Sequence, residues 1–123
     1  MKSAADYSQK HDPLQDVCPV RTALDVIRGR WKPSILLQLK QGVRRYTELQ
    51  DALPGIAAQT LTVQLRQLEA DGVVVRTIFA EVPARVEYRL SDFGRTLSKV
   101  MDQLEVWGTA YLARRARPPA RRA

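Results

Sequence analysis

At 123 residues, 45% of them hydrophobic, the chain can bury one modest core but not two, and it has no apolar run long enough to cross a membrane. Its first residues lack the apolar stretch of a secretion signal and its single cysteine excludes an internal disulfide, so we expect a cytoplasmic protein. The net charge of +7 suggests a polyanionic partner, although five arginines lie within residues 114–122 and the rest of the chain carries only +2.

The N-terminal part is predicted to hold an arm and one helix. Residues 1–15 are polar and contain the helix-breaking pair Asp12-Pro13, so we expect a flexible arm. Asp16 or Cys18 then opens a helix ahead of Pro19, because proline is tolerated at the first helical position. Four apolar residues share one face of this helix, which Gly29 ends: Val20, Ala23, Leu24 and Ile27.

A second helix is predicted from Trp31 to Leu39, with Ile35, Leu36 and Leu39 buried, ending at Gly42. Basic residues surround it, and no acid occurs within residues 26–47. The block consists of Arg28, Arg30, Lys32, Lys40, Arg44 and Arg45. We interpret it as the electrostatic footprint of phosphate binding; the alternative is a merely solvated basic face.

Two further helices are predicted around the tight turn Leu53-Pro54-Gly55-Ile56. The first covers residues 46–53, with Thr47 as its N-cap, and the second covers residues 57–71 and stops at Gly72. Helical spacing places Leu61, Leu65 and Leu68 in the core, and Gln59, Thr62, Val63, Arg66 and Ala70 on the opposite side.

A hairpin is predicted next, with strands over residues 73–80 and 85–90. In the second strand Val86, Tyr88 and Leu90 alternate with charged residues, whereas Val73-Val74-Val75 leaves the facing of the first strand open. Pro83 suits the connecting turn because it has no N–H to donate. Helix, turn, helix and hairpin in this order are typical of a winged helix-turn-helix, which places one helix in the DNA major groove.

The last predicted helix runs from about residue 92 to 113, is capped by Ser91 and is roughly 30 Å long. One apolar seam follows its length: Phe93, Leu97, Val100, Met101, Leu104, Trp107 and Tyr111. The seam is longer than so small a core needs, so we predict pairing with a second copy; packing within the chain is the alternative. A dimer would read two half-sites related by a dyad.

The motifs resemble those of the HxlR family of bacterial winged-helix regulators, relatives of the MarR group, over about residues 18–108. They are Cys18-Pro19-Val20, Gly29-Arg30-Trp31-Lys32, Arg45-Tyr46-Thr47-Glu48-Leu49, Leu53-Pro54-Gly55-Ile56, Leu61-Thr62, Leu65-Arg66-Gln67-Leu68-Glu69, Asp71-Gly72-Val73-Val74, Arg76, residues 82–90 and Trp107-Gly108. The resemblance implies an α+β, mostly helical fold and a homodimeric cytoplasmic transcription regulator. It further implies terminal helices that dimerise, over Val20, Leu24, Leu97, Val100, Met101, Leu104, Trp107 and Tyr111, and a palindromic operator. The family domain is predicted over residues 16–113, followed by a disordered basic tail over residues 114–123.

Several positions depart from the family pattern. Ala57 stands where a helix-capping Ser is frequent, so Thr60 or water must substitute for the cap. Gln59 and Thr60 are neutral where a basic residue is frequent, which predicts a different operator sequence. Tyr46 replaces a Phe and adds a hydroxyl, and Ser91 replaces a Thr as helix cap.

Nine residues are predicted to contact DNA: Arg45, Thr47, Gln59, Thr60, Thr62, Val63, Arg66, Arg76 and Arg85. Gln59 can form a bidentate pair with adenine, and Arg66 is the better phosphate ligand. Arg45 is predicted to clamp the backbone, and Arg85 on the wing enters the minor groove or meets a phosphate.

Cys18 is the one candidate for chemistry, because a thiol at a helix N-terminus gains from the amide dipoles. Oxidation or an inter-subunit disulfide would then make it a sensor of oxidants or electrophiles; a small buried apolar residue is the alternative. A second possibility is a small aromatic effector held between the terminal helices near Trp31, Trp107 and Tyr111. We predict no cofactor, metal site or enzyme activity, since the single histidine, His11, provides neither a ligand cluster nor a catalytic set.

Two other functions compete with sequence-specific regulation. A winged helix can bind protein, but this use predicts apolar residues where Gln59, Thr62 and Arg66 stand. A nonspecific DNA-coating protein, driven by the arginines of the tail, is the other alternative, and a salt titration separates it from a specific binder.

Overall fold

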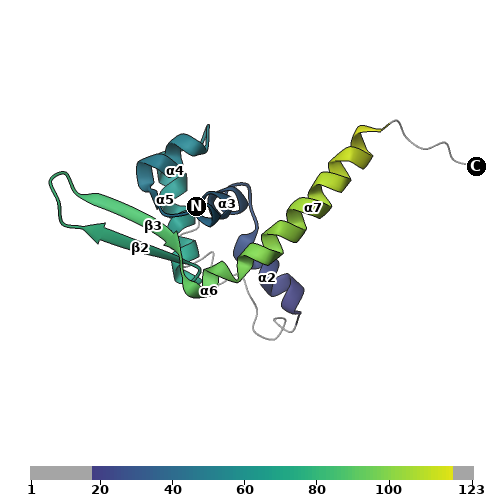
Figure 1. Cartoon of the computed structure of the whole chain (residues 1–123), viewed down its shortest axis with the longest axis horizontal. Helices are drawn as coiled ribbons and strands as arrows, with labels where there is room; N and C mark the ends of the chain where they lie inside the picture. The colour runs from purple at the N-terminus through teal and green to yellow at the C-terminus, as the bar shows by residue number, and fades with distance from the viewer. Residues whose placement is uncertain (1–17, 118–123) are drawn as a thin grey trace, which may run out of the picture.

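The computed structural model describes residues 18–117, and the predicted arm over residues 1–15 lies outside them (Figure 1). The elements in chain order are α2 (Pro19–Ile27), α3 (Lys32–Lys40), β1 (Arg44–Arg45), α4 (Tyr46–Ala52), α5 (Ala58–Ala70), β2 (Val74–Phe79), β3 (Arg85–Leu90), α6 (Asp92–Arg95) and α7 (Leu97–Ala116). This is the predicted winged helix-turn-helix: α4 and α5 form the helical pair, and β2 and β3 form the wing. Within residues 18–117, no helix is both apolar and long enough to cross a bilayer.

The core lies between α3, α4, α5 and the sheet. The predicted inward residues of α3 and α5 are almost fully buried: Ile35, Leu36, Leu39, Leu61, Leu65 and Leu68. Burial of this apolar surface supplies most of the stability of so small a domain. One prediction about α3 is wrong: Lys32, assigned to the phosphate-binding block, has an exposed fraction of 0%. It is the first residue of α3, and the turn of the chain at Trp31 directs it into the protein.

The sheet has three antiparallel strands in the order β1-β3-β2. Arg44 of β1 pairs with Tyr88 of β3, and Tyr88 pairs with Arg76 on the other side. Tyr88 and Leu90 are buried, as their alternation predicted, and Val73 and Val74 at the start of β2 are buried as well. Burial raises the pKa of the Tyr88 phenol and a nearby carboxylate raises it further, so the ring stays neutral in the core.

The start of α4 differs from the prediction. Its N-cap is Arg45 rather than Thr47, and Glu48 Oε1 accepts the Arg45 backbone N–H at 2.7 Å. Glu48 therefore satisfies one of the amides that a helix start leaves unpaired, as in a capping box. The sequence pattern favoured Thr47 because threonine is a common cap. Since Arg45 pairs with β3, the helix begins directly after it, at Tyr46, two residues earlier than a Thr47 cap would place it.

The C-terminal helix is also divided, where one continuous helix was predicted. Ser91 caps α6 as expected, with its Oγ accepting the Gly94 N–H at 2.8 Å. The chain then tightens, since the Thr96 N–H donates to the Phe93 carbonyl at 3.0 Å, and α7 begins at Leu97 in a new direction. Figure 1 shows α7 projecting away from the compact part of the molecule. It continues to Ala116, so residues 114–116 are helical rather than part of the predicted disordered tail.

Candidate nucleic-acid interface

Helix α5 presents a polar face away from the core. Gln59, Thr62 and Arg66 are exposed, and Val63 is half-buried between them. The first turn has no side-chain cap: Ala57 is the N-cap residue, and Thr60 is half-buried and does not cap it. The orientation predicted for this face is confirmed, whereas contact of its residues with bases stays a prediction.

Tyr46 ties the two helices of the helix-turn-helix together. Its hydroxyl donates to the carbonyl of Ala58 at 2.8 Å and lies 3.0 Å from Thr62 Oγ1. The hydroxyl that distinguishes tyrosine from phenylalanine thus contacts the first turn of α5. Thr62 is predicted to face DNA, and in the free protein its hydroxyl forms a hydrogen bond with the Tyr46 hydroxyl.

Glu69 brings together two arginines that were predicted to contact DNA. Its Oε1 lies 3.3 Å from Arg76 Nε, and its Oε2 lies 3.7 Å from Arg66 Nε. Arg66 on α5 and Arg76 on β2 therefore border one acid at the edge of the recognition face. Sequence reasoning missed Glu69, although its spacing of three residues from Arg66 is that of neighbours on one helix face.

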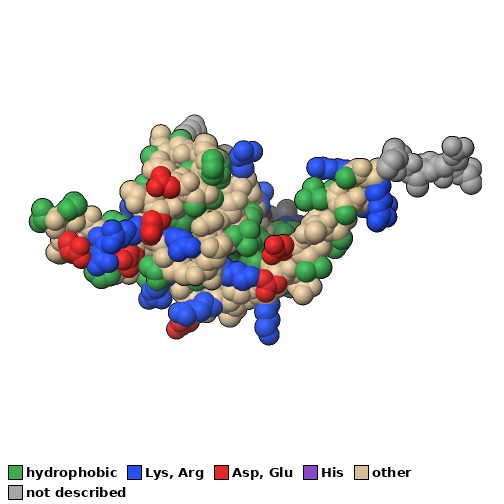
Figure 2. Space-filling view, turned by 45° about the horizontal axis from the view of Figure 1, so that its top comes forward, with side chains coloured by type: hydrophobic (Ala, Val, Ile, Leu, Met, Phe, Trp, Pro, Cys, Tyr) green, Lys and Arg blue, Asp and Glu red, His purple; other side chains and the backbone are tan. Residues whose placement is uncertain are grey.

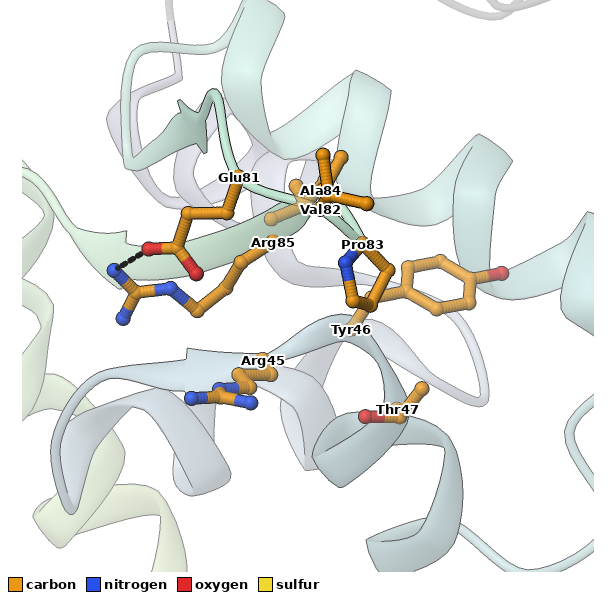
Figure 3. A pocket seen from close by; sticks show the side chains of 9 residues that line it. Arg45, Tyr46, Thr47, Glu81, Val82, Pro83, Ala84 and Arg85 are labelled. Atoms are coloured by element: carbon orange, nitrogen blue, oxygen red, sulfur yellow. Dashed lines mark hydrogen bonds and ion pairs between the residues drawn. The ribbon is translucent and has the colours of Figure 1, made fainter.

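A cleft of about 510 Å³ separates the start of α4 from the wing (Figure 3). Arg45, Tyr46 and Thr47 line one side of it, and the turn over residues 81–86 lines the other. Arg45 and Thr47 are exposed. The cleft opens beside the polar face of α5, since Tyr46 contacts both the cleft and α5.

Arg85 on the wing, predicted to enter the minor groove or meet a phosphate, is held by acidic residues of its own chain. Its guanidinium contacts Glu87 Oε2 at 2.6 Å and Glu81 Oε2 at 2.8 Å, and it lies 4.0 Å from the centre of the Phe79 ring. Figure 3 shows it turned toward Glu81. Two carboxylates neutralise this arginine. In the turn between β2 and β3, the apolar side chain of Val82 is fully exposed.

The predicted basic block is not one patch. Lys32 is buried, Lys40 forms an ion pair with Asp102 of α7, and Arg28 lies 3.7 Å from Asp25. Arg30 lies over the Trp31 ring, 5.0 Å from its centre. Only the adjacent pair Arg44-Arg45 leads directly into the helix-turn-helix.

Apolar side chains remain exposed on the two terminal helices, and Figure 2 shows those along α7. They are Val20 and Leu24 on α2, and Val100, Leu104, Val106, Trp107, Tyr111 and Leu112 on α7. The rings of Trp107 and Tyr111 stack with centroids 5.4 Å apart. Met101, also predicted to join the seam, is instead 6% exposed and packs in the core of its own chain, as Leu97 does in part. The reason is that the first turns of α7 cover the compact part before the helix leaves it.

Cys18 is the N-cap residue of α2 and is partly exposed. Its carbonyl accepts the Thr22 N–H at 3.0 Å, as expected for the residue that begins the helix. Residues 18–117 contain no group of three or more His, Cys, Asp or Glu side chains arranged to hold a metal ion.

The HxlR-like helix-turn-helix family matches residues 26–116 of the sequence. The chain belongs to this family. YdeP of Bacillus subtilis strain 168, an uncharacterised HTH-type transcriptional regulator, is 44% identical over 110 residues, which cover 89% of this chain and 84% of that protein. The chain is thus a DNA-binding transcription regulator with a winged helix-turn-helix.

Two solved structures are similar in sequence as well as in fold. The redox regulator HypR in its reduced form is 43% identical, with a TM-score of 0.73, over 76% of this chain and 92% of that chain. A MarR-family transcriptional regulator from Enterococcus faecalis V583 is 38% identical, with a TM-score of 0.72, over 89% of this chain and 97% of that chain.

Proposed function

We propose that two copies of this protein bind a palindromic operator and act as a sequence-specific repressor. The observation that carries the proposal is the polar outer face of α5, where Gln59 and Arg66 are exposed opposite a fully buried leucine stripe. In the bound state α5 lies in the major groove, and the wing of β2 and β3 lies over the flanking groove. A winged helix that binds protein would instead expose apolar residues on this face.

The roles of the individual residues follow from their exposure and partners. Gln59 reads a base edge, and Val63 beside it contacts a thymine methyl group. Arg45 and Thr47 hold the phosphate backbone at the cleft beside the wing. Arg66 and Arg76 contact phosphates once they exchange Glu69 for DNA, because their contacts with Glu69 are long, at 3.7 and 3.3 Å.

Replacing Gln59 tests the proposal directly. Gln59→Ala removes the amide that pairs with adenine, so affinity for a selected genomic fragment should fall by about 1–3 kcal/mol while affinity for random duplex stays unchanged. Fluorescence anisotropy at several salt concentrations measures both. Gln64→Ala is the matched control, since Gln64 lies on the same helix outside the polar face. Equal losses on both duplexes would refute base reading and favour nonspecific binding.

Control of DNA binding through Cys18 is the second part of the proposal. The thiol is partly exposed at the start of an apolar helix that we assign to the dimer interface, and the similar protein HypR is a redox regulator. Two Cys18 thiols, one from each copy, would lose two protons and two electrons to an oxidant such as diamide and form one disulfide. Diamide should change operator affinity of the wild-type protein and leave Cys18→Ser unaffected. An identical response of both proteins would exclude the thiol.

A further inference from the structure

A cavity of about 260 Å³ lies where α3, β3 and the junction of α6 with α7 meet. Its apolar lining comes from Leu39, Val43 and Leu90, two of which belong to the core. Its polar lining comes from Ser98 and three cationic residues, Lys40, Arg89 and Arg95, and no carboxylate lines it. An apolar floor under a rim of fixed positive charge is complementary to a small organic anion.

The three cations are not equally engaged. Lys40 pairs with Asp102, and Arg95 lies 3.3 Å from Asp92, whose side chain is 99% exposed. Arg89 has only a long hydrogen bond, 3.5 Å, to the carbonyl of Leu90, and no described carboxylate lies within ion-pair distance of it. Its planar guanidinium is therefore available to a carboxylate, which it can hold through two parallel hydrogen bonds.

We infer that this cavity binds a small organic acid, with its carboxylate on Arg89 and an apolar ring against Leu39, Val43 and Leu90. The volume suits a ligand smaller than a drug-sized molecule, because pockets that hold drug-sized molecules measure about 300 Å³ or more. A single-ring carboxylate fits, and it is ionised at neutral pH. The predicted effector site near Trp107 and Tyr111 is different, since that surface is an open depression along α7.

The position of the cavity connects it to the DNA-binding parts. Gly42 and Val43 lead into β1, which pairs with the wing strand β3 and ends at Arg45. On the opposite side, the pair Lys40–Asp102 joins α3 to α7. In Figure 2, side chains of both charges gather where α7 leaves the compact part. An anion on Arg89 also attracts Lys40 and competes with Asp102, so it changes the placement of α7 relative to the wing. This regulatory step rests on the proposed function.

Calorimetry of the full-length protein with benzoate, and with uncharged benzamide, tests the site without DNA. Benzoate should bind and benzamide should not, and Arg89→Gln should weaken benzoate binding at least tenfold. Arg115→Gln is the matched control, because Arg115 carries the same charge on the far part of α7. Val43→Asp, which places a carboxylate in the cavity at a half-exposed position, should also abolish binding. Thermal unfolding verifies that each variant folds.

Equal benzoate affinity of Arg89→Gln and Arg115→Gln, or no binding to the wild type, would overturn the site. For the regulatory step, benzoate should change the affinity for a selected operator fragment in the wild type and not in Arg89→Gln. Binding of benzoate with unchanged DNA affinity would refute this step alone. Failure to select any DNA fragment in the absence of benzoate would refute the proposed function and leave the calorimetric result intact.

Discussion

Individual arginines of the predicted interface are held by acids of the same chain. Arg66 and Arg76 border Glu69, and Arg85 lies between Glu81 and Glu87. These arrangements differ in strength, because the contacts to Glu69 are 3.3–3.7 Å long, whereas those to Arg85 are 2.6–2.8 Å and include the Phe79 ring. Phosphate can displace a long ion pair more easily than a short one supported by an aromatic ring. The wing arginine is thus restrained, while Arg45 on the other side of the cleft is exposed.

Releasing Arg85 should strengthen DNA binding. Glu81→Gln removes the carboxylate that holds Arg85 Nη2, so this nitrogen can donate to a phosphate while Nη1 stays on Glu87. We expect an affinity for random duplex several-fold higher and a salt slope steeper by about 0.9, which is one additional phosphate contact. Anisotropy between about 50 and 200 mM salt measures the slope.

The controls separate this release from a simple change of net charge. Glu105→Gln makes the same charge change on exposed α7 and should leave the slope unchanged. In an Arg85→Gln background, Glu81→Gln should have no further effect on the slope. A slope that steepens in the absence of Arg85 would disprove the restraint.

At the scale of elements, the sequence was informative wherever a pattern repeats. Helical spacing located α3 and α5 to within one residue at each end, and alternation predicted the buried face of β3. The two-residue strand β1 was missed because so short a segment has no period, and its pairing with β3 depends on tertiary contact. The same pairing moved the cap of α4 from Thr47 to Arg45.

A further error arose because residue type was taken as a guide to environment. Lys32 was assigned to the surface for its charge, but the bend before α3 places it inside. The cleft between Arg45 and the wing joins segments distant in sequence and has no local signal. The recognition face was predictable because it lies on one helix.

The junction between the hairpin and α6 depends on Gly94. A Cβ at this position would collide with the backbone carbonyl of Val73, at the turn that begins β2. Gly94→Ala should therefore destabilise the fold by about 1–3 kcal/mol, seen as a urea midpoint lowered without a change of m-value. Gly108→Ala is the control, since a Cβ there meets nothing within 4 Å and alanine favours a helix. A comparable loss of stability in both variants would show that the contact between Gly94 and the Val73 carbonyl is not the cause.

At the scale of the whole molecule, one part buries its apolar residues and another leaves them exposed. The core closes around α3, α5 and the sheet, with Met101 as the contribution of α7. Beyond Met101, Leu104, Trp107 and Tyr111 share one side of α7 and are 42–67% exposed, and Val20 and Leu24 on α2 are exposed as well. Contiguous apolar surface of this kind marks an interaction site. We propose that a second copy related by a dyad covers this surface with the same residues, which would place the two α5 helices at two half-sites.

A charge within this apolar seam should separate the two copies. Leu104→Glu places a carboxylate where two seams meet, so the variant should be monomeric at micromolar concentration by sedimentation. Affinity for a palindromic fragment should fall by about 10²-fold, because the two copies then bind their half-sites independently. Unfolding should change little, since Leu104 is outside the core. Thr109→Glu makes the same addition on the other side of α7, at about 100° per residue, and should remain dimeric. A Leu104→Glu variant that stays dimeric and keeps full operator affinity would mean that α7 is not the interface, and the half-site geometry would then require a different pair of surfaces.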